Sequence, residues 1–149
     1  MSIQAEVQAQ VIAAMKAHDD KRRDALRLIV NALKTEAKEK LHELSADEEI
    51  VVLTREAKKR REAIADYTKA GATDRAEKEM YELEIIQGYL PKQLSEDEVR
   101  AMISALVAEL NIVSKKDTGK LMKALMPKLK GVYPGNEAKK LVDALDLAD

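Results

Sequence analysis

Apolar side chains recur every three or four residues along most of this chain, and that spacing constrains its fold more than any other feature. It gives each of a series of helices one apolar stripe that must be buried. Five glycines and three prolines are too few for the many turns of an all-β fold. Because Phe and Trp are absent, we expect Ala, Leu, Ile, Val and Met to build the core of an all-α protein.

The first half of the sequence predicts four helices, over about 3–18, 21–41, 46–70 and 74–90. Ser45 and Glu48 have the spacing of a capping box, in which each side chain bonds the other residue's backbone N–H, so the third helix should begin after Ser45. Gly71 favours the left-handed turn that ends this helix. Thr73 is expected to cap the fourth helix.

Pro91 is expected to separate two domains, because proline has no backbone N–H and disfavours helical geometry in the preceding residue. We predict an N-terminal domain of residues 1–90 and a three-helix domain of residues 91–149, with the linker at 89–94. The three helices are expected to start at caps: Ser95 with Glu98 as a second capping box, Thr118 and Asn136. Pro127 should kink the middle one.

The sequence contains no catalytic or metal-binding pattern. Cysteine is absent, and His18 and His42 fall near predicted helix ends, where the helix dipole favours surface or capping roles. No glycine-rich phosphate loop or nucleophile elbow is present. The acidic clusters at 47–49 and 96–98 lie in first helical turns, where carboxylates are favoured. We therefore predict no catalytic residue, no metal site and no cofactor.

Signals for export and for membrane insertion are also missing from the sequence. The first twenty residues lack a basic stretch followed by an uninterrupted apolar one. No segment reaches the roughly 18 uninterrupted apolar residues that a membrane-spanning helix needs. We expect a cytoplasmic protein with no membrane partner.

Positive charge is concentrated in three runs, although the net charge is only −1. Between residues 115 and 130, four lysines fall on one helical arc with apolar residues roughly opposite: Lys116, Lys120, Lys123 and Lys130. Such a stripe suits RNA phosphates, and a face that only aids solubility is the alternative. Together with Lys128, these are the predicted RNA-binding residues.

The two other basic runs lie in the first half of the chain. A secondary basic patch is predicted on the third helix, at Arg55, Lys58, Lys59 and Arg61. The second helix carries a similar run at Lys21, Arg22, Arg23 and Arg27. A solvated charged face is the commoner cause of such runs.

Several stretches make the sequence similar to a known family. YLPKQLSEDEVRAMISALVAEL, followed by DTGKLMKALMPKLKG, resembles the GatB/YqeY family. LRLIVNALKTEAKEK and REAKKRREAIADYTKAGATDRAEKEMYELEIIQGYLPKQLS are similar to free-standing YqeY-like proteins, so the resemblance covers nearly the whole chain. It implies an N-terminal helical domain followed by a three-helix domain of the GatB/YqeY type. The latter resembles the C-terminal tail of the GatB protein of the glutamine-dependent aspartyl/glutamyl-tRNA amidotransferase.

The resemblance implies tRNA binding without an enzyme, because in the amidotransferase the tail helps to hold the tRNA while catalysis takes place on other domains and on another protein of the complex. We expect a tRNA-binding accessory protein linked to tRNA-dependent amidation, a carbon–nitrogen ligase activity with glutamine as amido-N donor. The implied partners are tRNA, aminoacyl-tRNA or amidotransferase components, and no DNA.

Two alternatives remain open. The chain could be a helical protein–protein adaptor that does not bind RNA and whose basic third helix meets an acidic partner. It could also be an independent amidase or carbon–nitrogen ligase, but such an enzyme needs a nucleophile, or a nucleotide and metal site, that the sequence does not show.

One departure from the family concerns the turn after the Pro127 helix. Family members usually read Gly-Arg-Ala-Asp-Gly there, whereas this chain reads GVYPG over residues 131–135. Both glycines remain, and the cation and the acid are gone. A phosphate contact made by that Arg would be lost, and Tyr133 is the residue that could stack on a base or ribose instead.

Overall fold

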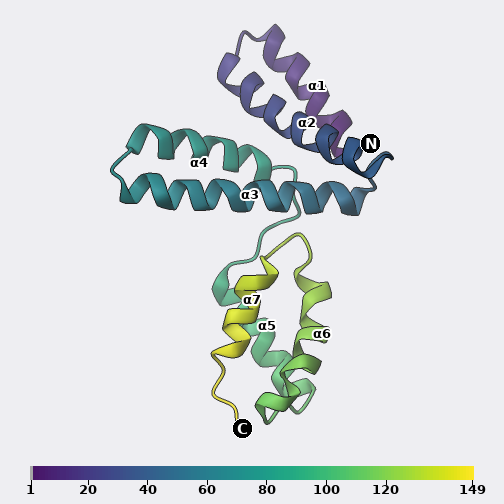
Figure 1. Ribbon diagram of the computed structural model, residues 1–149, viewed down its shortest axis with the longest axis vertical. Coiled ribbons are helices and arrows are strands. Elements are labelled where there is room, and N and C mark those ends of the chain that lie inside the picture. The colour runs from purple at the N-terminus through teal and green to yellow at the C-terminus, as the bar shows by residue number, and fades with distance from the viewer. Residues whose placement is uncertain (1) are drawn as a thin grey trace. The chain divides into compact units, whose positions relative to one another are not determined.

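The computed structural model describes residues 2–149 and is all-helical over this range (Figure 1). It contains seven α-helices, one short 3₁₀-helix and, as the only β-type pairing in the described residues, a single bridge between Ser114 and Ala148. The prediction of an all-α fold is confirmed. None of the helices within residues 2–149 has the length and apolar character that a membrane span requires.

The chain divides into two compact units, the first ending at Pro91 and the second running from Lys92 to Asp149. We refer to these as the first and second units and describe each by itself. That residues 1–90 and 91–149 are domains that fold independently stays a prediction.

The first unit consists of two helical hairpins, which Figure 1 draws in purple to teal. α1 (Ile3–Lys16) pairs with α2 (Asp20–Lys40), and α3 (Ala46–Lys69) pairs with α4 (Thr73–Gln87). Each hairpin turns tightly because its connection holds one residue with a left-handed backbone, His18 at φ 57° and Gly71 at φ 73°. These bounds differ from the predicted ones by at most a few residues.

The core of the first unit is aliphatic, as predicted, and α2 lies at its centre, in contact with the three other helices. Its largest fully buried side chains are Val7, Leu26, Leu33, Val52, Leu53 and Ile86. Burial of each such side chain contributes about 1.5–3 kcal/mol. The apolar stripes read from the sequence are therefore the surfaces that hold these helices together.

Glu49 is buried at the start of α3, with 3% of its surface exposed. Its carboxylate accepts the backbone N–H groups of Ile3 (3.2 Å) and Gln4 (2.8 Å), which are the first residues of α1. Helix N-termini carry free N–H groups and partial positive charge, so this carboxylate caps a helix other than its own. The sequence indicated only a favourable position in the first turn of α3.

Of the two predicted capping boxes, one is confirmed in full and the other in part. The capping box of Ser45 and Glu48 is confirmed, with both reciprocal hydrogen bonds present. The side chain of Ser95 caps α5 (Glu96–Glu109) by accepting the N–H of Glu98 at 3.1 Å, which is one half of a capping box.

The three remaining caps were predicted wrongly, because each of these residues lies inside its helix. Thr73 is the first residue of α4, and Thr118 is the first residue of α6 (Thr118–Leu129). The Thr118 hydroxyl donates backwards to the carbonyl of Lys115 because a 3₁₀ turn leads directly into α6. Asn136 is the second residue of α7 (Gly135–Asp143), whose start is set by Pro134.

The second unit packs α5, the 3₁₀-helix η1 (Lys115–Asp117), α6 and α7 around its own core. The core residues are Val99, Ile103, Leu106, Ile112, Leu121, Leu125, Leu129, Ala138, Leu141 and Val142. Part of the predicted linker belongs to this unit, because the side-chain amide of Gln93 donates to Gly131 O (2.8 Å) and Leu94 N–H donates to Val132 O (2.9 Å). Pro127 lies inside α6, near its C-terminal end. The kink stays a prediction.

Candidate nucleic-acid interface

The five lysines predicted to bind RNA lie on three consecutive segments of the second unit. Lys120, Lys123 and Lys128 lie on α6, whereas Lys116 lies in η1 and Lys130 follows the last residue of α6. The prediction that four of them share one continuous helical arc is therefore wrong for Lys116, because the 3₁₀ turn has a different pitch. The backbone leaves helical geometry only after Lys130, at its ψ of 117°.

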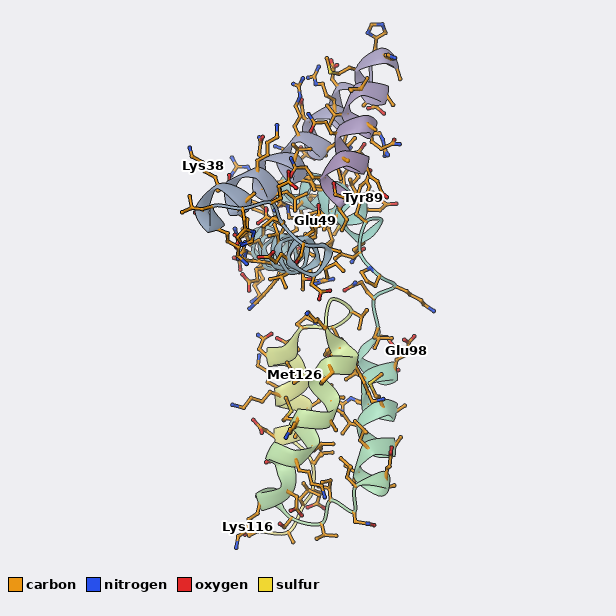
Figure 2. The ribbon with its side chains drawn as sticks, turned by 90° about the vertical axis from the view of Figure 1, so that its right-hand side faces the viewer. Lys38, Glu49, Tyr89, Glu98, Lys116 and Met126 are labelled. Atoms are coloured by element: carbon orange, nitrogen blue, oxygen red, sulfur yellow. The ribbon has the colours of Figure 1, made fainter. Side chains whose placement is uncertain are left out.

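All five side chains are exposed, and we call this set the lysine surface. Of its members, Lys116, Lys120, Lys123 and Lys128 form no ion pair with any residue in the range 2–149. Figure 2 shows Lys116 pointing away from the helices at one end of the unit. Residues 115–130 contain six lysines and one aspartate, and the charges of these four lysines are not balanced by an ion pair within the described residues.

The lysine surface rests on a rigid apolar support. Leu121, Leu125 and Leu129 on the opposite side of α6 are almost completely buried, with 0–1% of their surface exposed. The C-terminal segment fixes η1, because Lys115 N–H donates to Ala148 O (2.7 Å) and the Lys115 ammonium pairs with Asp149 (3.2 Å). The lysines of α6 therefore project from a helix that is held by apolar burial on its opposite side.

The turn at residues 131–135 holds Tyr133 partly against the core, and its stacking role stays a prediction. Gly131 has a left-handed backbone (φ 77°), and the next two N–H groups donate to Leu129 O at 3.0 and 3.1 Å. Tyr133 is half-buried against the core of the second unit. Its pKa is raised by burial and further by the nearby charges of Glu96 and Glu137. Carboxylates beside a ring repel phosphate, so this environment disfavours the stacking role predicted for Tyr133.

The secondary basic patch predicted on α3 is partly neutralised by acids. Arg55 pairs with Glu36 of α2 at 2.7 Å, and Lys59 pairs with Glu56 at 3.1 Å. Lys58 and Arg61 make no ion pair within the described residues. The structure thus leaves only two of the four predicted cations uncompensated, and Arg61 is itself half-buried.

Arg60, in the middle of the same run, is a structural residue that the sequence did not reveal. Its side chain is 12% exposed and lies 2.8 Å from the Glu56 carboxylate and 3.5 Å from that of Glu82 on α4. A signal was present, since Arg60 follows Leu53 and Ala57 at helical spacing and so falls beside the buried stripe. Because Arg60 stands within a run of cations, the sequence alone could not distinguish it from a solvent-exposed arginine.

The two carboxylates around Arg60 respond differently to burial. Burial tends to raise the pKa of Glu56, but hydrogen bonds from Lys59 and Arg60 outweigh it and hold that pKa below the ordinary value. Burial and the charge of Glu79 raise the pKa of Glu82, while Arg60 opposes them. This cluster joins α3 to α4 and is buried, so it is a structural element of the first unit.

The two histidines excluded from chemistry in the sequence lie where solvent reaches them. His18 and His42 are exposed beyond the ends of α1 and α2. Across the described part of the chain, no group of three or more His, Cys, Asp or Glu side chains is placed to hold a metal ion.

Comparison with protein families decides what kind of protein carries this surface. The sequence model of the family described as Yqey-like protein matches residues 4–145. This chain belongs to the YqeY-like family. The match covers both units of this YqeY-like protein, from the first turn of α1 to beyond the end of α7. No curated protein gives a significant match to it.

Proposed function

We propose that this YqeY-like protein binds tRNA through the lysine surface and serves tRNA-dependent amidation in the cytoplasm as an accessory protein. The observation that carries the proposal is the set of four exposed lysines that pair with no acid within residues 2–149: Lys116, Lys120, Lys123 and Lys128. Uncompensated lysines on a rigid helix attract polyanions, and RNA releases bound counterions when they bind.

The lysine surface suits the RNA backbone better than base edges. Lysine carries a flexible point charge with three donors and no acceptor, so it contacts phosphate oxygens without reading sequence. We therefore expect binding that depends strongly on salt and weakly on sequence. Each phosphate contact should contribute roughly 0.7–0.9 to the slope of log K against log salt concentration.

The link to amidation comes from the resemblance of the second unit to the C-terminal tail of the GatB protein of the amidotransferase. In this proposal the protein contributes RNA affinity, and amidotransferase components supply the carbon–nitrogen ligase chemistry with glutamine as amido-N donor. Aminoacyl-tRNA is then a natural form of the bound RNA.

The test compares two charge-reversal pairs with the same i, i+3 spacing. Lys120→Glu with Lys123→Glu alters the lysine surface, and Lys58→Glu with Arg61→Glu alters the two uncompensated cations of α3. Labelled tRNA is titrated with each variant at several salt concentrations, and circular dichroism verifies that both remain helical. We expect the α6 variant to lose most of its affinity, since two attractive charges become repulsive, and the α3 variant to keep it.

The opposite outcome would assign RNA binding to the first unit. If the wild-type protein does not bind tRNA even at low salt, the proposal fails and the adaptor hypothesis replaces it. Glutamate is a good helix former, so neither pair should unfold its helix.

A further inference from the structure

The first unit has a groove between α2 and the C-terminal part of α4 that the proposed function does not use. It consists of two adjoining hollows of about 420 and 270 Å³, which share Tyr81 as a lining residue. Arg22, Ile85 and Tyr89 line the larger hollow, and Lys21 and Lys78 line the smaller one. The larger hollow lies within the size range of small-molecule sites in proteins.

Arg22 is the cation of the larger hollow, and its side chain is half-buried without a hydrogen bond or ion pair to any described residue. The next residue shows the contrast, because Arg23 is held by Asp20 (3.0 Å) and Asp24 (2.9 Å). A guanidinium offers a planar fork of donors that matches the oxygens of a phosphate. Arg22 therefore has its donors available at the wall of a cavity.

The acids around the groove are mostly occupied by cations that lie outside it. Asp24 pairs with Arg23, and Glu82 pairs with Arg60. Glu84 is the remaining carboxylate of the larger hollow, and it is exposed. Lys21, Arg22 and Lys78 are matched by three acids in the lining, so an anion is favoured locally at Arg22, whose donors have no partner among the described residues.

Two tyrosines supply flat apolar surface in the same groove. The ammonium of Lys21 lies 4.2 Å from the centre of the Tyr81 ring, which fixes one side of the aromatic wall. Tyr89, labelled in Figure 2, is half-buried. Burial raises its pKa, the charge of nearby Arg22 acts in the opposite direction, and the charge of Glu6 raises the pKa further. Aromatic side chains beside an arginine are the combination on which nucleobases stack.

We infer that this groove binds a nucleoside phosphate, with the base against Tyr81 and Tyr89 and the phosphate on Arg22. The same chemistry could come from a free mononucleotide or from an unpaired nucleotide of a single-stranded RNA. The inference concerns the first unit alone, and it stands whether or not the lysine surface binds tRNA.

The experiment titrates the full ¹⁵N-labelled chain with AMP, adenosine, inorganic phosphate and a short single-stranded oligoadenylate. We expect AMP to shift the amide signals of Arg22, Gly88 and Tyr89 and to bind about tenfold more tightly than adenosine or phosphate alone, because it makes both kinds of contact. Followed at these same signals in the Lys120→Glu, Lys123→Glu protein, tighter binding of the oligonucleotide than of AMP would identify RNA as the source, and equal binding would identify the free nucleotide. The inference is overturned if AMP leaves these signals unchanged, or if phosphate alone shifts them equally.

Variants test the two contacts separately. Arg22→Gln should weaken AMP binding about tenfold by removing the charge-assisted hydrogen bonds, and Tyr81→Leu should weaken it while keeping apolar volume. Arg27→Gln is the matched control, because Arg27 is an exposed arginine of α2 that lines neither hollow and donates to Met15 Sδ. Thermal unfolding verifies that each variant is folded.

The Lys120→Glu, Lys123→Glu protein completes the design and should bind AMP as the wild type does. Loss of AMP binding in that variant, or in Arg27→Gln to the same degree as in Arg22→Gln, would show unspecific charge attraction and overturn the inference. Failure of tRNA binding at the lysine surface leaves these AMP results unaffected, so the two proposals fail separately.

Discussion

The cations of α3 and those of η1 and α6 differ in what surrounds them. α3 packs against α2 and α4, and both neighbours bring carboxylates to it: Glu36 reaches Arg55, and Glu82 reaches Arg60. α6 packs against α5, α7 and η1 through its leucines, and those neighbours bring no ion-pairing carboxylate, within the described residues, to Lys120 or Lys123. Whether the cations of a basic run form ion pairs within the fold or stay available to a ligand thus depends on the helices that pack beside the run.

This difference shows how similar charge density serves two purposes. On α3 the arginine at the centre of the run is buried between two acids, so its charge contributes to the packing of a helical hairpin. On α6 the lysines cover a helix already held by apolar burial, so their charge is available for a ligand. Exposed charges that form no ion pair within the described residues are therefore the better candidates for binding a ligand.

The largest effect should come from removing the buried cation. Arg60→Gln leaves the buried Glu82 carboxylate without its cation, and we expect the free energy of unfolding to fall by about 3–5 kcal/mol at neutral pH. Lys123→Gln, on the exposed surface of α6, should change it by less than about 0.5 kcal/mol. Urea denaturation measures both values.

The pH dependence of Arg60→Gln gives an independent check. Burial already raises the pKa of Glu82 above the ordinary 4.5, and the loss of Arg60 should raise it further. A carboxyl whose pKa is raised in the folded state contributes most stability below the pKa of the unfolded state and loses it as pH rises through the folded pKa. The deficit of the variant should therefore shrink as the pH falls through the folded-state pKa values of Glu82, which lie above 4.5, and should be smallest below pH 4.5. A deficit that does not change with pH would mean that Arg60 acts only through packing.

Much of the fold could be predicted because it depends on spacing within each segment. The apolar stripes and the Ser45–Glu48 capping box placed the helices within a few residues. The start of α6 could not be predicted, because the 3₁₀ turn before it is tied to Ala148, more than thirty residues away in sequence. The role of Glu49 was hidden for the same reason, since the N–H groups that it accepts belong to α1.

The next effect concerns the apolar side of α6, which supports the lysine surface. Leu125 is completely buried, so Leu125→Ala should lower the free energy of unfolding by about 2–5 kcal/mol through lost burial and the cavity left behind. Lys120→Ala is the control on the opposite side. An effect of Leu125→Ala below about 0.5 kcal/mol would show that this side of α6 is not the packed one. The side that carries the lysines would then not be the exposed side.

The lysines of the candidate site could be predicted from the density of positive charge in the sequence. That the cations of α3 are paired with acids could not be predicted in this way. The acid that neutralises Arg55 lies 19 positions earlier in the sequence, on another helix. Arg60 and Glu82 are also joined only when α3 and α4 fold against each other. Local patterns identify where charge is dense, and only tertiary packing identifies which of those charges are already balanced.

The smallest effect tests whether pairing with acids is what keeps α3 from binding RNA. Glu36→Gln releases Arg55 while Lys40 keeps its contact with Glu48 at 2.8 Å. One freed cation at the surface should raise tRNA affinity by only about two- to threefold at low salt, since exposed ion pairs are worth about 0–1 kcal/mol. Glu39→Gln is the matched control, because it removes the same charge from the same helix at an exposed glutamate with no ion pair to the described residues.

If both variants raise the affinity equally, net charge explains the gain and the contrast between α3 and α6 does not rest on pairing. If Glu36→Gln alone raises it and steepens the salt dependence by roughly 0.7–0.9, the released arginine has become one more phosphate contact, and local acids are what distinguishes the two basic surfaces.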